Sequence, residues 1–552
     1  MSEDKQHERC QNMNDEINNS DYSECLHDID DIIKSVRDKN EGLCTYGLPL
    51  PTCARRSQLS HEEEIYDIDE QLRLATHALS LFNTDQAFFC NNVLEQICLS
   101  PHQRSYHCAY LDAPGGTGKT FCFKYLLCHF RSKGIKVLPV GSSAISAILL
   151  PGGRTAHSGL KIPIPVTDES HCNFTRRSNL GKKLLETKVI LWDEILMMDR
   201  KCVECVDRSL KALFGNDLPF GGIFVIFGGD CRQILPVLPK ASKAQIIYAC
   251  LQRSYLMRYM KKFTFVRNER VLSNSGCEDY CNLLLRIGEG KETVLLQDGT
   301  SDCIRIPETL LFEGDEEDLI NWVHPDPNNI DQHAAILSAW NEEVNDINQR
   351  CLHRMEAPLF TSYSCDKLLD ESQEHMYPIE LLNSLTPPGF PLHNLEIKVG
   401  APIILLRNLR SNDGLCNGTR LIANTVTPNL LTATIQNGSH SGNTVFIPRI
   451  CFSTDETIPF QFTRRQFPVK LAFALTINKS QGQTLTKVGI YLPKPIFNHG
   501  GLYVALSRVT DPNNVKLFIK HMKSIQGFLQ NDHRVYTKNI VYREIISVCS
   551  SI

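Results

Sequence analysis

The chain has 552 residues, of which 42% are hydrophobic and 22% charged, and this length exceeds what one hydrophobic core supports. No apolar run approaches the roughly 18 residues that a bilayer span requires, which excludes a helical membrane protein. The first 75 residues hold 18 acidic and 8 basic side chains, so the net charge of −4 combines an acidic beginning with a mildly basic remainder. A basic remainder is compatible with contact to a phosphate backbone.

The opening residues MSEDKQHERC resemble neither a signal peptide nor a mitochondrial presequence, because they lack an apolar centre and are acidic. We expect the protein in the nucleus, with the cytoplasm and the mitochondrion as alternatives. The 22 cysteines are scattered, and only Cys202 and Cys205 form a CxxC. We expect reduced cysteines that act as small apolar side chains.

The acidic segment 1–75 has few aromatics up to about residue 60 and is predicted to be partly disordered. Helical patterns begin after His61, and a second one follows a cap-like Asn83. The side-chain amide of Gln86 in that helix could pair with an adenine edge, and the alternative is a solvated surface glutamine.

A glycine-rich turn follows the apolar run that ends near Asp112 and precedes a helical pattern. The sequence APGGTGKT is typical of a phosphate-binding loop, whose backbone NH groups surround a phosphate. Lys119 supplies a positive charge, Thr120 can ligate Mg²⁺, and the helix N-terminus adds its dipole. The predicted cradle residues are Gly115, Gly116, Thr117, Gly118, Lys119 and Thr120.

The next buried strand, KVLPVGSS, ends in small polar residues. Ligands of a parallel sheet bind at the carboxyl ends of its strands, so short hydroxyls there could hold the phosphates of a threaded strand. The predicted residues of this rim are Ser142, Ser143, Thr155 and His157. A small insertion is expected near 160–186.

Two further apolar strands end in polar residues. The strand KVILWDE places Asp193 to hold Mg²⁺ and Glu194 to activate a water molecule. The strand GIFVIFGGDCRQ places Gln233 where it can sense the γ-phosphate. Three phosphate-facing strand ends predict a nucleotide-hydrolysing RecA-type domain.

The run from Trp192 to Val237 resembles the equivalent region of the Pif-type helicases of superfamily one, class B, and is most similar to the version in Helitron transposons. The resemblance implies an α/β protein with two RecA-like domains that hold the nucleotide between them, while single-stranded DNA crosses their top. A small SH3-like β insert is implied in the second domain.

Later stretches match the remaining motifs of that family. KKFTFVRNERV places Arg270 where a second-domain arginine reaches the γ-phosphate, although Glu269 stands where an apolar residue is usual. LAFALTINKSQGQTL forms a polar cluster suited to phosphate and sugar contacts, with Asn478 where many relatives have His. In GLYVALSRVT, Arg508 would be the second arginine finger. The predicted DNA contacts in this half are Thr476, Ser480, Gln481 and Thr484.

The resemblance implies four regions: the segment 1–75, a first RecA-like domain at 76–262, a second at 263–399 and 468–552, and the β insert at 400–467. It implies an ATP- and Mg²⁺-dependent DNA helicase that moves 5′ to 3′ on single-stranded DNA and unwinds forked duplexes. A monomeric motor that acts in DNA repair, recombination or telomere maintenance, or within a Helitron-type element, is expected. The alternatives are an RNA or RNA/DNA-hybrid helicase and a transposon remnant that binds DNA without catalysis.

Overall fold

The computed structural model describes residues 26, 43, 49–52, 66–269, 278–294, 302–370, 372, 375–410, 413–436, 438, 440–454, 459–522, 526–527 and 534–551. Contacts divide the chain into two compact units. The larger unit comprises Asp67–Tyr363, Pro388–Pro448 and Phe467–Ile552, and the smaller one contains Met1–Tyr66, Ser364–Pro387 and Arg449–Gln466. The segment 1–75, predicted to be partly disordered, therefore lies mostly outside the described residues.

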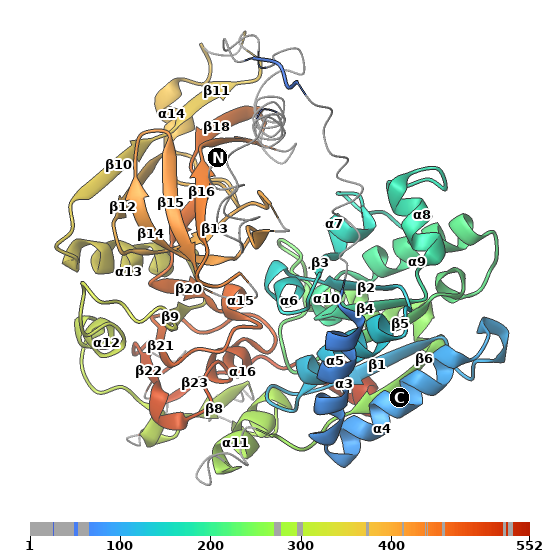
Figure 1. Ribbon diagram of the computed structural model, residues 1–552. Coiled ribbons are helices and arrows are strands. Elements are labelled where there is room, and N and C mark those ends of the chain that lie inside the picture. The colour runs from blue at the N-terminus through green and yellow to red at the C-terminus, as the bar shows by residue number, and fades with distance from the viewer. Residues whose placement is uncertain are drawn as a thin grey trace. The chain divides into compact units, whose positions relative to one another are not determined.

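The larger unit contains a six-stranded, fully parallel sheet in the order β3-β2-β4-β5-β1-β6 (Figure 1). Its strands are β1 (Cys108–Asp112), β2 (Val137–Gly141), β3 (Arg154–Thr155), β4 (Val189–Asp193), β5 (Phe224–Gly229) and β6 (Met260–Thr264). All residues of β1, β4 and β5 are buried, as expected for apolar strands covered on both faces by helices.

Helices cover this sheet on both faces, and alternate residues of each strand enter different cores. In β4, Ile190 and Trp192 pack with Val203 of α9, whereas Val189 and Leu191 pack with Phe123 of α5. The helices of this region are α3 (Ile68–Ser80), α4 (Thr84–Cys98), α5 (Lys119–Ser132), α6 (Ala144–Ile148), α7 (Ala156–Leu160), α8 (Asn179–Glu186), α9 (Arg200–Phe214) and α10 (Lys243–Ala249).

A second parallel sheet follows, in the order β20-β9-β21-β22. Its strands are β9 (Ala334–Ser338), β20 (Ala474–Thr476), β21 (Lys487–Leu492) and β22 (Val515–Ile519). The helices of this half are α11 (Glu278–Gly288), α12 (Glu316–Val323), α13 (Asn341–Arg354), α15 (Ile477–Ser480), α16 (Gly501–Leu506) and α17 (Arg543–Ser551).

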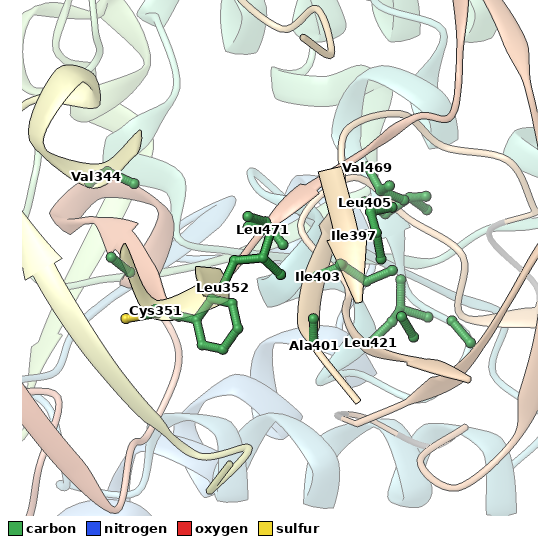
Figure 2. Packing of buried hydrophobic residues seen from close by; sticks show 14 of the residues in the cluster. Val344, Cys351, Leu352, Ile397, Ala401, Ile403, Leu405, Leu421, Val469 and Leu471 are labelled. Atoms are coloured by element: carbon green, nitrogen blue, oxygen red, sulfur yellow. The ribbon is translucent and has the colours of Figure 1, made fainter. Parts of the chain in front are cut away.

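A five-stranded antiparallel sheet joins the second parallel sheet, in the order β16-β15-β14-β13-β19. Its strands are β13 (Pro402–Leu405), β14 (Arg420–Val426), β15 (Leu430–Ile435), β16 (Thr444–Pro448) and β19 (Val469–Leu471). Figure 2 shows Leu352 of α13 beside Leu471, with Ile403 and Leu421 of the antiparallel sheet in the same cluster. One apolar core therefore serves the parallel sheet and the antiparallel sheet together.

Short strands complete the larger unit: β10 (Leu359–Tyr363) pairs with β12 (Asn394–Lys398), and β8 (Cys303–Arg305) lies between β7 (Thr293–Val294) and β23 (Tyr536–Lys538). The smaller unit holds β11 (Cys365–Leu368), β17 (Ile450–Ser453) and β18 (Phe462–Gln466) in the order β11-β18-β17, with helix α14 (Ile379–Ser384). Arg464 of β18 and Asp366 of β11 are both fully buried and form an ion pair at 2.6 Å.

The predicted α/β class with parallel sheets is confirmed. None of the described helices is both long and apolar enough to cross a bilayer. The cysteines in the described part of the chain are free thiols.

Candidate active site

The glycine-rich turn leads from β1 directly into α5. Gly116 and Gly118 have φ angles of 91° and 90°, in the left-handed region that favours glycine. Gly118 is the residue before the first turn of α5, and Lys119 begins the helix. The NH groups of this loop and the helix N-terminus therefore converge as they do in phosphate-binding loops.

Lys119 lies between the two carboxylates at the end of β4. Its Nζ is 2.6 Å from Asp193 Oδ1 and 2.7 Å from Glu194 Oε1. Because β1, β5 and β4 are neighbours in the sheet, the loop after β1 meets the end of β4 at one edge. The predicted trio of Lys119, Asp193 and Glu194 is thus in direct contact.

The electrostatics of the trio follow from burial and pairing. Burial raises the pKa of Asp193, and Lys119 opposes this rise. Burial would also raise the pKa of Glu194, but Lys119, Gln481 and Arg508 lower it below its usual value. Burial alone would lower the pKa of Lys119, yet the carboxylates raise it. Glu194 is therefore held as a carboxylate beside a protonated Lys119.

The backbone of Glu194 is left-handed, with φ 53° and ψ 42°. A non-glycine residue in this region costs on the order of 1 kcal/mol or more, so packing must hold it there. The short helical turn Ile195–Met197 follows at once, and Ile195 is fully buried in the core. This turn directs the Glu194 side chain away from the strand axis and toward Lys119.

Gln481 from the second half of the chain reaches the same carboxylate. Its Nε2 donates to Glu194 Oε2 at 3.2 Å and to Gln233 Oε1 at 2.8 Å. Gln233 in turn donates to Asp230 Oδ2 at 3.3 Å. The ends of β4 and β5 are thus joined by side chains to the segment that follows β20. The sequence predicted Gln481 as a DNA contact, and in this structure its amide is hydrogen-bonded to Glu194 and Gln233.

Tyr503 of α16 forms a second link of this kind. Its hydroxyl donates to Asp230 Oδ2 at 2.7 Å, and the backbone NH of Gly115 donates to the same hydroxyl oxygen at 3.4 Å. Arg232 forms an ion pair with Asp230, with 3.2 Å between Arg232 Nη1 and Asp230 Oδ1. Tyr503 therefore connects the phosphate loop, the end of β5 and the second half through one phenol group.

Asp112, Asp230 and Cys231 place potential metal ligands within 4.8 Å of one another. Positive side chains already face these carboxylates, because Arg232 contacts Asp230 and Lys262 Nζ is 3.7 Å from Asp112 Oδ2. The cluster is thus a buried ion-pair network, and its cations come from the protein.

Arg508 is buried at the end of α16. Its Nη1 donates to the carbonyl oxygens of Gln483 at 2.9 Å and Ser480 at 3.3 Å, and its Nε donates to Val504 O. The guanidinium nevertheless lies close enough to Glu194 to lower the pKa of that carboxyl. The structure thus places Arg508 beside the trio, while Arg270 lies outside the described residues.

The segment that leaves β6 runs along the phosphate loop. The backbone NH of Phe265 donates to Asp112 O at 3.0 Å, and that of Glu269 donates to Gly116 O at 3.0 Å. The side chain of Asn268 donates to Gly115 O at 3.2 Å. This segment connects the first sheet to α11, so the chain passes over the loop on its way between the two halves.

Gln86 lies beneath the phosphate loop. Its side-chain oxygen accepts the Asn83 NH in a capping box, and its Nε2 donates to Thr117 O at 3.1 Å. A Cβ added at Gly118 would lie 2.4 Å from this nitrogen. The amide that the sequence assigned to an adenine edge thus supports the loop from below in this structure.

The predicted DNA contacts of the first half lie at the carboxyl edge of β2 and β3, whose ends Gly141 and Thr155 pair. Ser142 Oγ accepts Trp192 Nε1 at 3.1 Å, and Ser143 caps α6 through Ser146. Thr155 is the last residue of β3 and immediately precedes α7, and His157 Nε2 lies 4.0 Å from the sulfur of Cys202.

In the second half, Thr476 precedes α15 and its side chain makes no capping bond. Ser480 is buried and donates to Ile477 O at 2.8 Å, whereas Thr484 is exposed. A Cβ on Gly482 would lie 3.3 Å from Ile145 Cγ2 of α6. The two predicted groups of DNA contacts therefore lie next to each other.

Sequence reasoning missed Tyr503, Asn268 and the role of Gln481 at Glu194. Each makes its contact across more than 150 residues of chain. The only local signal was the position of Tyr503 within GLYVALSRVT, a stretch already assigned through Arg508.

The residues fit a magnesium-bound nucleoside triphosphate. Left-handed glycines shape the loop, Lys119 provides the buried cation, and Asp193 and Thr120 are the hard oxygen donors that Mg²⁺ prefers. A side chain at Gly118 would collide with Gln86, whose Nε2 lies 2.4 Å from an added Cβ, and would displace the support beneath the loop.

Comparisons with known proteins point in the same direction. Residues 82–297 match the PIF1-like helicase family, and residues 380–426 match the 2B domain of the DNA helicase Pif1. The ATP-dependent DNA helicase Pif1 of Campylobacter jejuni is 27% identical over 430 residues, which cover 75% of this chain and 89% of the relative. The Xenopus laevis protein PIF1 is 23% identical, and the match covers 79% of this chain but 61% of that relative.

Solved structures show the same fold. A Pif1 helicase studied at forked double-stranded DNA has a TM-score of 0.59 at 23% identity, and the match covers 80% of this chain and 93% of the other. Pif1 of Bacteroides with ADP-AlF3 and single-stranded DNA has a TM-score of 0.57 at 22% identity, covering 79% and 92%. Pif1 of Candida albicans has a TM-score of 0.57 at 22% identity, covering 85% and 98%.

Proposed function

The chain belongs to the PIF1-like helicases, and from this membership we propose that it hydrolyses ATP to move along single-stranded DNA and separate duplex DNA. It is an ATP-dependent DNA helicase. The observation that carries the proposal is the contact of Lys119 with Asp193 and Glu194, reached from the second half by Gln481.

Nucleotide binding falls to the phosphate loop. The NH groups of Gly115, Gly116 and Gly118 and the Lys119 ammonium hold the phosphates. Thr120 and Asp193 would hold Mg²⁺, which would neutralise charge on the transferred phosphoryl group. Lys119 then exchanges part of its contact with the two carboxylates for contact with the phosphates.

Glu194 orients and deprotonates the attacking water, for which it must be ionised. Its lowered pKa satisfies that condition at neutral pH. Gln233 senses the γ-phosphate. Gln481 is hydrogen-bonded to both residues and keeps the Glu194 carboxylate oriented.

Arg508 and Arg270 stabilise the charge that develops on the phosphoryl group in the transition state. Arg508 approaches from the second half, beside Glu194. Residues from both halves of the chain contact the γ-phosphate. ATP, which has this phosphate, and ADP, which lacks it, therefore favour different distances between the two halves. That difference is what converts hydrolysis into movement.

DNA binding involves the adjoining rims of the two parallel sheets, with Ser142, Ser143, Thr155, His157, Thr476, Ser480 and Thr484 as the predicted contacts. The sequence also predicts Gln481 as a DNA contact, but its hydrogen bonds to Glu194 and Gln233 favour a role in hydrolysis. The proposal includes a monomeric enzyme that moves from 5′ to 3′ and unwinds forked duplex DNA. It also includes a nuclear location and roles in DNA repair, recombination or telomere maintenance. The Helitron connection remains a prediction from the sequence.

The direct test compares the wild type with Lys119→Ala and with Lys124→Ala, a change of an exposed lysine on the same helix. We expect Lys119→Ala to abolish DNA-stimulated ATP hydrolysis and unwinding, and Lys124→Ala to match the wild type. Equal ATPase rates for the wild type and Lys119→Ala would favour a remnant that binds DNA without catalysis.

Substrate and polarity follow from one further experiment. Duplexes with either a 5′ or a 3′ single-stranded tail, made of DNA or RNA, are incubated with ATP or a non-hydrolysable analogue. We expect unwinding only of the 5′-tailed DNA and only with ATP. Preferential unwinding of RNA-tailed or hybrid substrates would favour the alternative RNA helicase.

A further inference from the structure

An exposed aromatic pair lies at the carboxyl edge of the second parallel sheet. The rings of Trp340 and Phe497 have centroids 4.6 Å apart, and 36% of Trp340 and 57% of Phe497 are exposed. Exposing both rings is costly in water unless another flat or apolar group covers them. The exposed pair is therefore a candidate binding site for a flat or apolar group.

The topology places this pair beside the predicted DNA contacts. Trp340 follows β9, whose last residue Ser338 pairs with Thr476 of β20. Phe497 follows β21, the neighbour of β9 on the other side. Three adjacent strands thus deliver Trp340, Thr476 and Phe497 to one edge, where parallel sheets bind ligands.

A hydrogen bond connects the two sets of residues. Asn498, next to Phe497, donates from Nδ2 to Asn478 Oδ1 at 3.0 Å. Asn478 lies between Thr476 and Ser480 in the polar segment after β20. The aromatic pair is therefore continuous with the surface that the proposed function assigns to DNA.

The charges around the pair favour a base over a phosphate. Lys494 Nζ lies 5.5 Å from the Trp340 ring, but its charge is shared with Glu343 at 3.3 Å and Glu342 at 4.0 Å. A site with two carboxylates and one ammonium does not neutralise a phosphate. An uncharged, flat ligand that stacks on an aromatic ring suits it, and every nucleobase offers such a face.

We propose that Trp340 and Phe497 form a stacking platform for a base of the single-stranded DNA on which the enzyme moves. This inference rests on the proposed helicase function and specifies how the second half holds the strand. Stacking is tolerant of sequence, as a motor that steps along any strand requires.

Binding of a fluorescent oligodeoxythymidine provides the test. We expect Trp340→Ala and Phe497→Ala each to weaken binding about tenfold, the order of one lost base stack. Trp340→Phe should recover most of the affinity. Phe88→Ala removes an equally exposed ring from α4, 59% exposed, and should bind as the wild type does.

Three readouts separate stacking from a structural effect. Stacking releases no counterions, so the slope of affinity against salt should be unchanged in Trp340→Ala while the affinity falls. On an abasic oligonucleotide, the wild type and Trp340→Ala should bind equally. The wild type should also show quenching of tryptophan fluorescence by oligodeoxythymidine, and Trp340→Phe should lack that quenching.

The possible outcomes distinguish this inference from the helicase function. If the wild type binds and unwinds DNA but both alanine variants bind oligodeoxythymidine normally, the platform is refuted and the helicase stands, and the exposed rings then face a protein. An equal loss on abasic DNA also refutes stacking. If the wild type does not bind single-stranded DNA at all, the proposed function fails together with the platform.

Discussion

Glu194 combines a strained backbone with a paired carboxylate. Its φ of 53° holds the side chain toward Lys119, and its lowered pKa keeps it ionised. Both features suit a residue that must accept a proton from water at a fixed position.

Glu194→Gln tests this role at the scale of one residue. The amide keeps the shape but cannot accept the proton, so we expect kcat for ATP to fall by about 10² to 10⁴ while nucleotide binding persists. Single-turnover hydrolysis and nucleotide titration measure the two effects. Glu186→Gln, an exposed change on α8, is the control and should leave both values unchanged. A kcat within a few-fold of the wild type would assign the proton to another group.

His499 is a buried neutral imidazole with a defined tautomer. Its Nδ1 accepts the Tyr542 backbone NH at 2.8 Å, so Nε2 carries the proton and donates to Cys231 O at 3.1 Å. Burial lowers the pKa of His499 to about 4. A proton added at Nδ1 would face the Tyr542 NH directly.

This predicts a stability that depends on pH. The unfolded histidine titrates near ~6.5, so the stabilisation is present above that pH and is lost as the pH falls toward 4. The shift corresponds to roughly 3 kcal/mol when fully expressed. Urea unfolding at pH 5 to 8 should show a shallower pH slope for His499→Asn than for the wild type. An unchanged slope would show that His499 titrates normally.

The short helix α15 brings two functions together in a few residues. Thr476 and Thr484 flank it at accessible positions, whereas Gln481 turns inward to Glu194 and Gln233. A DNA strand bound at Thr476 and Thr484 can thus change the position of the Glu194 carboxylate through Gln481.

Gln481→Ala and Thr484→Val should therefore separate hydrolysis from DNA binding. The first removes hydrogen bonds at Glu194, so we expect kcat to fall about tenfold with unchanged affinity for single-stranded DNA. The second removes an exposed hydroxyl, so we expect weaker DNA binding with unchanged hydrolysis in the absence of DNA. The assignment is wrong if Gln481→Ala weakens DNA binding and spares hydrolysis.

The smaller unit depends on a different kind of contact. The Arg464 guanidinium is fully buried and donates to both oxygens of Asp366 and to the carbonyls of Leu382 and Leu385. A pair of this type is costly to break and is often replaceable by apolar groups.

Asp366→Ala should lower the free energy of unfolding of this unit by about 3 to 5 kcal/mol, because it leaves a buried charge unpaired. Limited proteolysis of the segments 364–387 and 449–466 measures the loss. Glu380→Ala, on the exposed face of α14, is the control. The double change Asp366→Leu with Arg464→Met should restore much of the protection, and failure to do so would point to a role beyond charge pairing.

Short-range patterns explain why so much of the architecture could be predicted. The apolar strand, glycine turn and helix around Lys119 form a contiguous stretch, and the strand that ends at Asp193 is another. Gln86 and Gln481 were predicted as ligand contacts because their positions along the chain suited that role. Their contacts within the protein, to Thr117 O and Glu194, depend on packing between distant segments, which no local pattern records, and the ligand contacts stay predictions.

Within the larger unit, a few hydrogen bonds link the segments that follow the first parallel sheet to those of the second. Tyr503 bonds Asp230 and Gly115, and His499 bonds Cys231 O. Such directional contacts can be lost and regained with little change in buried apolar area.

Tyr503→Phe tests one of these links. Loss of the hydroxyl removes the partner of the Gly115 NH and leaves Asp230 Oδ2 with its hydrogen bond from Gln233, so we expect ATP affinity to fall several-fold and stability by about 1 kcal/mol. Tyr491→Phe removes a comparable bond to Glu316 within the second half and should reduce stability only. Nucleotide titration and thermal unfolding of both variants make the comparison. Equal ATP affinities would show that the phenol only stabilises the fold.

The passage of the chain over the phosphate loop makes the nucleotide pocket sensitive to tension. Phe265 bonds the end of β1, and Asn268 and Glu269 bond Gly115 and Gly116 of the loop, so a pull on the second half reaches the loop through these hydrogen bonds. We expect a force that opposes movement along the DNA to change the rate at which ADP dissociates. A load of this kind at a stalled replication fork would then change the rate of ATP hydrolysis.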